Sequence, residues 1–190
     1  MTTTVRGNHR ELILDVALKQ MSEHGSTGAS MRALAKECGL NVATLYHYFE
    51  SKDELLAAVV AERQYGTRLA AIPQIDHAAP PLDRLRTIWT TVWEGAMEEQ
   101  SVWRLLLGEG IRGEGSVRPV AQELFTVMRD GLPVWIASAL PEVVDAVACT
   151  ELMIGQLFSG FVELIFNPDL DVSKIGRRNG DVLALALKLA

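Results

Sequence analysis

The stretch SMRALAKECGLNVATLYHYF, residues 30–49, decides the fold, because it predicts two short helices separated by a tight turn. The serine at its start and Asn41 are residue types that cap helix N-termini, and apolar residues with helical spacing follow each of them. Gly39 ends the first helix and permits the left-handed backbone that a short turn requires. The pattern therefore predicts helices over 30–38 and 42–49 with a three-residue turn between them.

Two short helices joined by a turn that contains glycine form the helix-turn-helix of DNA-binding proteins. Apolar side chains at Leu34, Ala35 and Leu45 would hold the two helices together. Turning Leu45 and Phe49 inward leaves a polar and aromatic face towards solvent. This outward face consists of Ala43, Thr44, Tyr46, His47 and Tyr48. Its hydroxyls, ring N–H and methyl suit phosphate oxygens and base edges in a major groove, although the two tyrosines could instead pack on neighbouring helices.

Helical patterns continue on both sides of this stretch. A preceding helix is predicted over about 9–24, with Gly25 at its end, and the sequence SKDE at 51–54 matches a capping box that opens a fourth helix. Three prolines in IPQIDHAAPPL, residues 72–82, indicate a linker, because proline interrupts a helix. Later helical segments are predicted at about 83–99, 101–108, 117–139, 142–166 and 175–189. Strand patterns are scarce, so the sequence predicts an all-α fold with a small N-terminal bundle joined to a larger one.

Composition limits the classes of protein and of partner. The 190 residues carry a net charge of −6, and residues 1–55 hold six Lys/Arg against seven Asp/Glu. A DNA-binding face would therefore depend on the placement of its residues and not on bulk charge. No apolar run approaches the ~18–20 residues of a membrane span, and the N-terminus has no signal-peptide pattern. The two cysteines, Cys38 and Cys149, lie far apart without metal-like spacing, so we expect a cytoplasmic protein that does not enter a membrane.

The motifs that would indicate an enzyme are weak. Residues 108–113, GEGIRG, match the GxGxxG fingerprint of dinucleotide sites, but they follow a helical pattern and not a strand. A flexible connection between helices is the better interpretation of this segment. The four histidines are scattered and form no metal-ligand pattern, and no Ser/His/Asp arrangement follows from spacing. We therefore expect no catalytic residue, no metal site and no cofactor.

The run SMRALAKECGLNVATLYHYFESKDELLAAVV, which extends the opening stretch to residue 60, closely resembles the N-terminal signature of the tetracycline-repressor (TetR) family of transcriptional regulators. With the first helix, the resemblance covers roughly residues 8–60, a third of the chain. The family often has serine or another short polar residue at position 41, but the asparagine found here caps a helix equally well. The matching positions are Ser30, Ala35, Gly39, Ala43, Thr44, Leu45, Tyr46, Tyr48, Phe49 and Lys52.

The resemblance implies DNA-contact roles for particular residues. Those that fall where the family contacts DNA phosphates are Ser30, Tyr46, Tyr48 and Lys52. Those that fall where it reads base edges are Arg32, Val42, Ala43, Thr44 and His47. Lys52 also stands at a helix N-terminus, whose backbone N–H groups add to phosphate binding. Arg32 is the candidate for guanine, because its guanidinium can donate two parallel hydrogen bonds.

The resemblance also implies a division of labour between two parts of the chain. Residues 1–55 would form a helix-turn-helix DNA-binding domain, and residues 56–190 a helical effector-binding and dimerisation domain. Pockets between bundle helices are mostly apolar with a few polar groups, so a small apolar or aromatic effector is the expected ligand. The candidate lining residues are Trp89, Trp93, Glu94, Met97, Trp103, Phe125, Met128, Met153 and Gln156. The alternative is that the large side chains among them are ordinary core.

The segments 117–139 and 142–166 resemble in position the helix pair through which the family dimerises, although packing within one chain is the alternative. The expected function is that of a ligand-responsive transcriptional regulator. It would act as a repressor that binds a near-palindromic double-stranded DNA operator as a homodimer and is released by a small-molecule effector, with residues 51–70 as the lever between the domains. The alternatives are an activator, an effector-independent regulator, or a helical small-molecule-binding protein without DNA binding.

Overall fold

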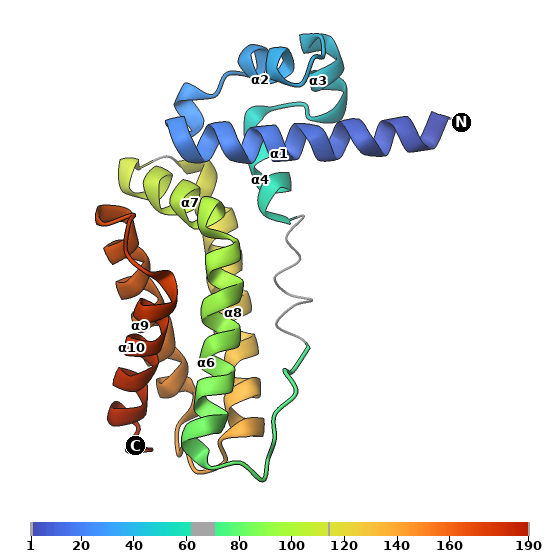
Figure 1. The fold of residues 1–190 in the computed structure, drawn as a ribbon. Coiled ribbons are helices and arrows are strands. Elements are labelled where there is room, and N and C mark those ends of the chain that lie inside the picture. The colour runs from blue at the N-terminus through green and yellow to red at the C-terminus, as the bar shows by residue number, and fades with distance from the viewer. Residues whose placement is uncertain (1, 62–70, 114, 190) are drawn as a thin grey trace. The chain divides into compact units, whose positions relative to one another are not determined.

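The computed structural model describes residues 2–61, 71–113 and 115–189 of the chain (Figure 1). Within these ranges every regular element is a helix, as the sequence predicts. Residues 62–70, the second part of the predicted lever over 51–70, lie outside the described residues. The fold is therefore all-α, with the helix-turn-helix near its N-terminus.

The chain divides into two compact units. Unit 1 consists of Met1–Tyr65 with Glu99–Leu124, and unit 2 consists of Gly66–Glu98 with Phe125–Ala190. The helix-turn-helix thus shares its compact unit with a later segment that the sequence analysis assigned to the larger bundle. The predicted domains, which divide the chain by function at residues 55 and 56, stay a prediction.

The helices of unit 1 are α1 (Thr2–Gly28), α2 (Met31–Glu37), α3 (Val42–Tyr48), α4 (Lys52–Ala61), α7 (Gln100–Arg112) and the short 3₁₀ helix η1 (Gly115–Val117). α1 contacts α2, α4 and α7, while α2 contacts α3, so α1 is the central helix of this unit (Figure 1). η1 contacts both α4 and α7. The later segment therefore belongs to the same packed body as the helix-turn-helix.

The apolar spacing of α1 marks its buried side. Ile13, Ala17 and Met21 recur at i, i+4 and i+8 and are all buried. The helix extends beyond both predicted ends, but Gly25 has φ 74° and ψ 164°. Regular helical geometry therefore stops at the glycine that the sequence marks as the helix end.

The predicted flexible connection over residues 108–113 is wrong. α7 continues through Arg112, and Gly113 closes it in the left-handed conformation with φ 80°. Val102, Leu105 and Leu106 are buried at i, i+3 and i+4, which gives α7 one apolar face. The glycine-rich segment is thus the last turns of a helix and its C-terminal cap.

Unit 2 is built from α6 (Pro81–Glu98), most of α8 (Arg118–Ala139), α9 (Ala146–Phe166) and α10 (Val172–Ala186). α6 and α9 each contact α10 and also contact one another. Residues 72–80 are not helical, as the prolines of the predicted linker indicate, and Pro81 is the first residue of α6. Proline is favoured at this position, because the first helical N–H has no partner within the helix.

α9 reaches the length and apolar character of a membrane span, which the sequence analysis did not find anywhere in the chain. It is the one such helix among the described residues, and Cys149, Met153 and Leu157 lie on its buried side. The core helix of a soluble protein passes the same test of length and composition. The feature is therefore weak evidence for a membrane segment.

Candidate nucleic-acid interface

Each of the two helices of the helix-turn-helix starts with the N-cap residue that the sequence predicts, Ser30 for α2 and Asn41 for α3. Ser30 Oγ accepts a hydrogen bond from Ala33 N at 3.1 Å. Asn41 Oδ1 accepts from Thr44 N at 2.7 Å and also from Thr44 Oγ1 at 2.9 Å. Both cap residues have extended backbone, as N-caps require. These bonds fix the start of α2 and of α3.

The turn between the two helices closes α2 through a pair of backbone hydrogen bonds. Leu40 N donates to Ala35 O at 2.8 Å, and Gly39 N donates to Lys36 O at 3.1 Å. Gly39 has φ 67°, the left-handed conformation that the sequence predicts. This is the Schellman arrangement of a helix C-terminus, and it turns the chain directly into α3.

The buried side of α3 confirms the predicted orientation of this helix. Leu45 is 0% exposed and Phe49 is 2% exposed, and both lie in the core of unit 1 with Leu34 and Ala35 of α2. Because these two side chains point inward, Ala43, Tyr46 and His47 are left exposed on the other side of the helix. The expected wedge between the helices is therefore present.

The predicted DNA-contact residues differ in how far they reach solvent. The exposed ones are Ser30, Arg32, Ala43, Tyr46 and His47, and the half-buried ones are Val42, Thr44, Tyr48 and Lys52. Tyr46 is 48% exposed. The ring of Tyr48 lies edge-on to His47, with 5.8 Å between ring centroids. All nine residues lie within or at the ends of α2, α3 and α4, which form one segment of unit 1.

Lys52 is the first residue of α4. One of the two hydrogen bonds at the start of this helix differs from the predicted capping box. Ser51 Oγ accepts from Glu54 N at 3.0 Å, as expected. Glu54 Oε2 reaches back to the N–H of Glu50 at 2.6 Å, whereas a capping box would place this bond on the cap residue itself. The return bond is thus one residue earlier in the chain, and it secures the segment between α3 and α4.

Contacts from α1 that the sequence analysis missed hold α2 and α3 in place. Arg10 Cζ lies 5.6 Å from the centroid of the Phe49 ring, a cation–π contact. Gln20 Nε2 donates to Glu37 Oε2, and Lys19 Nζ lies 3.7 Å from Glu37 Oε1. Each contact joins residues that are seventeen or more positions apart, so spacing along the chain gives no signal for it.

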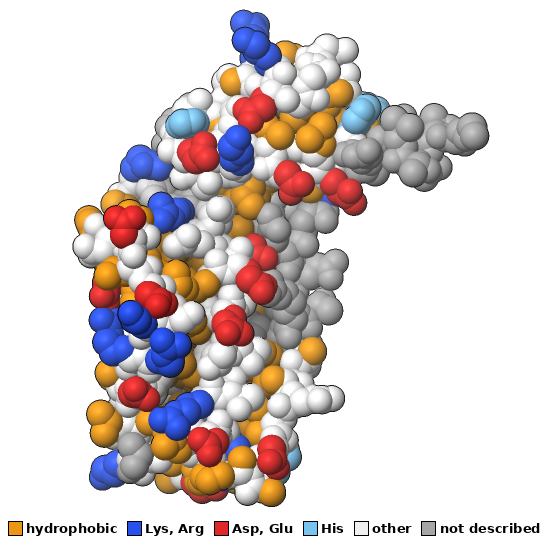
Figure 2. All heavy atoms as spheres, viewed as in Figure 1, with side chains coloured by type: hydrophobic (Ala, Val, Ile, Leu, Met, Phe, Trp, Pro, Cys, Tyr) orange, Lys and Arg blue, Asp and Glu red, His pale blue; other side chains and the backbone are white. Residues whose placement is uncertain are grey.

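The charges of the molecule are mixed in sign. Figure 2 shows acidic and basic side chains interspersed over the visible face. In unit 2, Arg178 pairs with Glu163, Arg86 with Asp181, and Lys174 with Asp171. Bulk charge does not mark a DNA-binding face here, so the shape and chemistry of α3 carry the assignment.

Two of the predicted effector-lining residues, Trp89 and Trp93, are hydrogen-bonded to the backbone of α10. Trp89 Nε1 donates to Gly176 O at 2.6 Å, and Trp93 Nε1 donates to Val172 O at 3.2 Å. The two indole rings are buried, with their centroids 5.8 Å apart. These side chains therefore join α6 to α10.

Glycines on the facing helices make room for the two rings. A Cβ at Gly160 of α9 would lie 2.5 Å from Trp93, and one at Gly176 would lie 2.5 Å from the Trp93 indole nitrogen. A Cβ at Gly180 would lie 2.6 Å from Trp89. The three helices therefore approach closely only because these positions lack a side chain.

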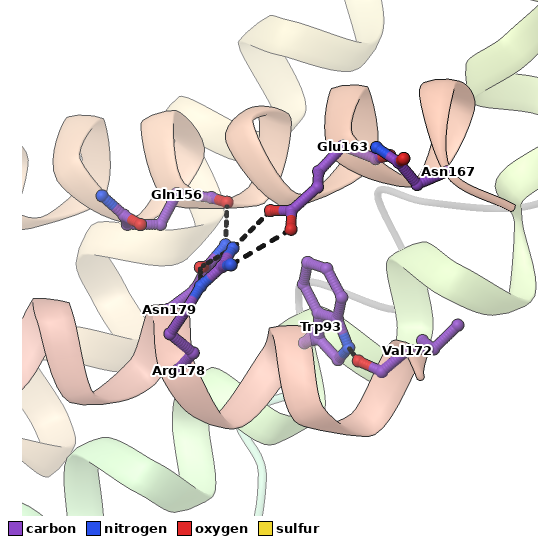
Figure 3. Close-up of polar contacts among 7 residues, drawn as sticks. All are labelled: Trp93, Gln156, Glu163, Asn167, Val172, Arg178 and Asn179. Carbon is purple, nitrogen blue, oxygen red and sulfur yellow. Dashed lines mark hydrogen bonds and ion pairs between the residues drawn. The ribbon is translucent and has the colours of Figure 1, made fainter. Parts of the chain in front are cut away.

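A polar network next to this contact links α9 and α10 (Figure 3). Asn179 Nδ2 donates to the backbone carbonyl of Gln156 at 2.8 Å. Arg178 Nη1 donates to Glu163 Oε1 at 3.1 Å, and Nη2 donates to Oε2 at 2.5 Å. Asn179 Oδ1 accepts from Arg178 Nε and Nη2, at 3.2 and 3.1 Å. The main chain of Gln156 is thus bound to α10, while its side chain is half-buried.

The remaining predicted lining residues are dispersed. Phe125 of α8 stacks on Phe158 of α9, with 5.6 Å between ring centroids. Met128 and Met153 are buried in unit 2, Met97 is half-buried and Glu94 is exposed. Trp103 lies in α7 and therefore in unit 1. The predicted set is divided between the two units, and its role in effector binding stays a prediction.

The outward side of α8 and α9 combines an ion pair with apolar and small residues. Arg129 Nε lies 2.7 Å from Glu151 Oε1 and connects the two helices. The exposed residues of one α9 face are Ala148, Leu152, Gly155, Ser159, Val162 and Phe166. Ile154, Gly160 and Phe161, which lie in the segment 142–166 predicted to take part in dimerisation, are buried within unit 2. For these three residues, packing within one chain is the correct interpretation.

The comparisons with known proteins agree with this geometry. Residues 13–59 match the model of the bacterial regulatory proteins of the tetR family. The chain is 32% identical over 79 residues to the HTH-type transcriptional regulator BetI of Agrobacterium fabrum, a match that covers 42% of this chain and 38% of that protein. It is 42% identical over 55 residues to UidR of Escherichia coli, which covers 29% and 28%. The matched segment thus spans less than two fifths of either relative.

Solved structures share the fold over nearly the whole chain. A transcriptional regulator from Aquifex aeolicus gives a TM-score of 0.72 at 17% identity, covering 94% of this chain and 99% of that one. GusR of Salmonella enterica gives 0.70 at 19% identity, covering 95% and 96%. The named relatives are transcriptional regulators, in agreement with the expectation that the chain is not an enzyme. Residues 13–59 thus carry the signature of the tetR family of bacterial regulatory proteins, and the chain shares its all-helical fold with these solved structures.

Proposed function

We propose that this protein is a transcriptional regulator that binds a near-palindromic DNA operator as a homodimer. The observation that carries the proposal is the outward face of α3. Leu45 and Phe49 anchor the helix, and Tyr46 and His47 are left exposed on a helix-turn-helix. A recognition helix presented in this way enters the major groove with its side chains against base edges.

The individual contacts follow from the chemistry of each side chain. Thr44 donates its hydroxyl hydrogen to Asn41 Oδ1, so it offers a base edge only an acceptor oxygen and a methyl group. These groups suit the amino group of cytosine or the methyl group of thymine. Arg32 is exposed on α2 and suits guanine, while Lys52 at the start of α4 suits a phosphate.

The proposed homodimer uses the exposed side of α8 and α9. Leu152, Val162 and Phe166 are 44%, 45% and 77% exposed there, and small residues between them permit close approach of a second helix pair. Two copies would place their α3 helices about one turn of DNA apart, ~34–36 Å. This division of labour is the one expected of residues 1–55 and 56–190.

A small apolar or aromatic effector is the proposed signal, and repression is the proposed sign of regulation. An effector releases DNA only to the extent that its affinity differs between the binding and non-binding conformations. Unit 2 has an apolar interior, in which Met128 is buried and Phe125 stacks on Phe158. An activator or an effector-independent regulator would share the same DNA-binding face.

A cytoplasmic location is part of the proposal, because the sulfur chemistry suits a reducing compartment. Cys38 and Cys149 are both free and buried. Burial raises the pKa of the Cys149 thiol to about 11, so this thiol is protonated and unreactive at neutral pH.

Selection of binding sites from a random duplex library by the full chain tests the proposal directly. We expect a near-palindromic site whose affinity falls with added salt. Arg32→Ala should weaken binding by about 1–3 kcal/mol and relax specificity at one base pair, whereas Lys52→Ala should weaken all sequences alike and flatten the salt slope. Arg177→Ala, which removes the same charge from an exposed position of α10, is the control.

Failure to select any sequence would favour the alternative of a helical small-molecule-binding protein without DNA binding. Parent-like binding by both Arg32→Ala and Lys52→Ala would instead show that the contact residues are wrongly assigned. A monomer in sedimentation at micromolar concentration would contradict the homodimer.

A further inference from the structure

α7 carries a fully buried carboxylate inside the unit that holds the helix-turn-helix. Glu109 is 0% exposed, and its Oε1 lies 2.6 Å from Arg112 Nη2. Arg112 is half exposed, so the pair runs from the interior of unit 1 to its surface. Burying a carboxylate is costly unless it is paired and hydrogen-bonded, so the contact with Arg112 contributes to keeping Glu109 inside the unit.

This pair lies directly against the backbone of α1 at the point where the helix ends. A Cβ on Gly25 would lie 2.8 Å from Arg112 Nη2 and 2.9 Å from Glu109 Oε1. Gly108, one turn before Arg112, is also close, since a Cβ there would lie 3.3 Å from the same nitrogen. The glycine-rich segment of α7, which dinucleotide binding does not explain, thus holds an ion pair against Gly25.

Gly25 is the position from which the chain leaves α1 for the helix-turn-helix. Its φ of 74° and ψ of 164° break the helical geometry, and its carbonyl accepts a hydrogen bond from Ala29 N at 3.3 Å. Ala29 is buried, and Ser30 follows it as the N-cap of α2. The direction taken at Gly25 therefore sets where α2 and α3 begin.

We propose that Glu109 and Arg112 are positioning residues for DNA recognition. They do not lie on the DNA-binding face; they hold the exit of α1 and thereby the pose of α2 and α3. This inference rests on the proposed function, and it assigns to α7 a part in DNA recognition that the sequence signature of residues 13–59 does not contain. Loosening the pair should change which spacing of operator half-sites the dimer prefers.

The test compares Arg112→Gln and Glu109→Gln with Arg104→Gln, which removes an equal charge from an exposed position of the same helix. The probe is the duplex that the parent selects from a random library, together with versions whose half-sites are one or two base pairs closer or farther apart. Binding is measured by fluorescence anisotropy, and thermal unfolding is followed in parallel. Glu109→Gln alters a buried residue, so the test rests on Arg112→Gln, at a half-exposed residue, if the Glu109 variant does not fold.

We expect Arg112→Gln to lose about tenfold in affinity on the parental spacing, with a smaller loss or a gain on another spacing. The dependence of its affinity on salt should stay that of the parent. Arg112→Lys should restore part of the preference for the parental half-site spacing. Arg104→Gln should bind like the parent. Equal losses on every spacing would reduce the pair to a purely structural role and overturn the inference. Parent-like binding by both Gln variants would overturn it too, whereas a parent that selects no DNA would overturn the proposed function and the inference with it.

Discussion

Gly39 of unit 1 and three glycines of unit 2 are needed for different physical reasons. In unit 1, Gly39 has φ 67° and nothing within 4 Å of where a Cβ would stand, so it is needed for its backbone conformation. In unit 2, Gly160, Gly176 and Gly180 do not have positive φ, but a Cβ at each would lie 2.5–2.6 Å from a tryptophan atom. These three glycines are needed for space.

This difference between the glycines determines whether the role of each one can be predicted from the sequence. Gly39 stands between two capped helical patterns, so its role follows from residues within ten positions of it. The role of Gly176 depends on Trp93, which lies more than eighty residues earlier and arrives only when α6 packs on α10. A glycine required for its backbone conformation can therefore be recognised from the neighbouring sequence, whereas a glycine required for space cannot.

The largest expected effect comes from filling one of the spaces in unit 2. Gly176→Ala places a methyl group 2.5 Å from the Trp93 indole nitrogen and should lower the free energy of unfolding by about 3 kcal/mol. Urea unfolding measures the change, and the control is Gly110→Ala, a helical position with open space around it. That control should be neutral or stabilise the protein by about 0.5–1 kcal/mol.

A double-mutant cycle shows whether space is the cause. In a Trp93→Leu background, Gly176→Ala should cost much less than in the parent, because the ring that it overlaps is gone. An unchanged penalty would mean that Gly176 is needed for its backbone and not for space, and the contrast between the units would fail.

A smaller effect is expected at the turn of unit 1. Gly39→Ala places a residue with a Cβ in the left-handed conformation and should lower the free energy of unfolding by about 1–2 kcal/mol. The new methyl group would overlap no other atom, so the backbone conformation alone causes the loss. Gly39→Asn should recover part of this loss, since asparagine tolerates the conformation better. Hydrogen exchange of peptides from α2 and α10 locates the change, which should stay in α2. Protection lost in α10 instead would contradict a local role for the turn.

Removing one indole donor should have a comparable or smaller effect. Trp89→Phe keeps an aromatic ring beside Gly180 but leaves Gly176 O without its 2.6 Å donor. The expected loss is about 1 kcal/mol in urea unfolding, the net value of one hydrogen bond. The matched control is Trp89→Leu, which also removes the ring and should cost clearly more. Equal costs for both variants would show that the hydrogen bond contributes all of the stability and the ring none.

The same distinction between local and distant contacts explains which parts of the site could be predicted. The caps at Ser30 and Asn41, the turn at Gly39 and the buried Leu45 all follow from signals within one short stretch, and the structure has them as expected. The membership of α7 in unit 1 could not be read from the sequence, because it depends on packing against α1. The indole contacts of Trp89 and Trp93 with α10 were missed for the same reason.

The smallest expected effect is a loss of stability in acid that comes from unit 2. Hydrogen bonds from Arg84, Arg129 and Arg178 lower the pKa of the carboxyls they contact, Glu142, Glu151 and Glu163. A carboxyl whose pKa is lower in the folded protein binds fewer protons there than in the unfolded chain. Its contribution is therefore complete above the unfolded pKa of about 4.3 and disappears as the pH falls through the lower folded value.

The urea midpoint should accordingly be flat from neutral pH to about pH 5 and then decline. In Arg178→Gln, the pKa of Glu163 should return towards its ordinary value, so the decline should be shallower and the loss at neutral pH small, because the pair is partly exposed. Hydrogen exchange should place the acid-sensitive protection in α9 and α10, where Glu163 and Arg178 lie. An acid response of Arg178→Gln identical to that of the parent would show that this pair, although it joins residues fifteen positions apart, contributes nothing to the stability of unit 2.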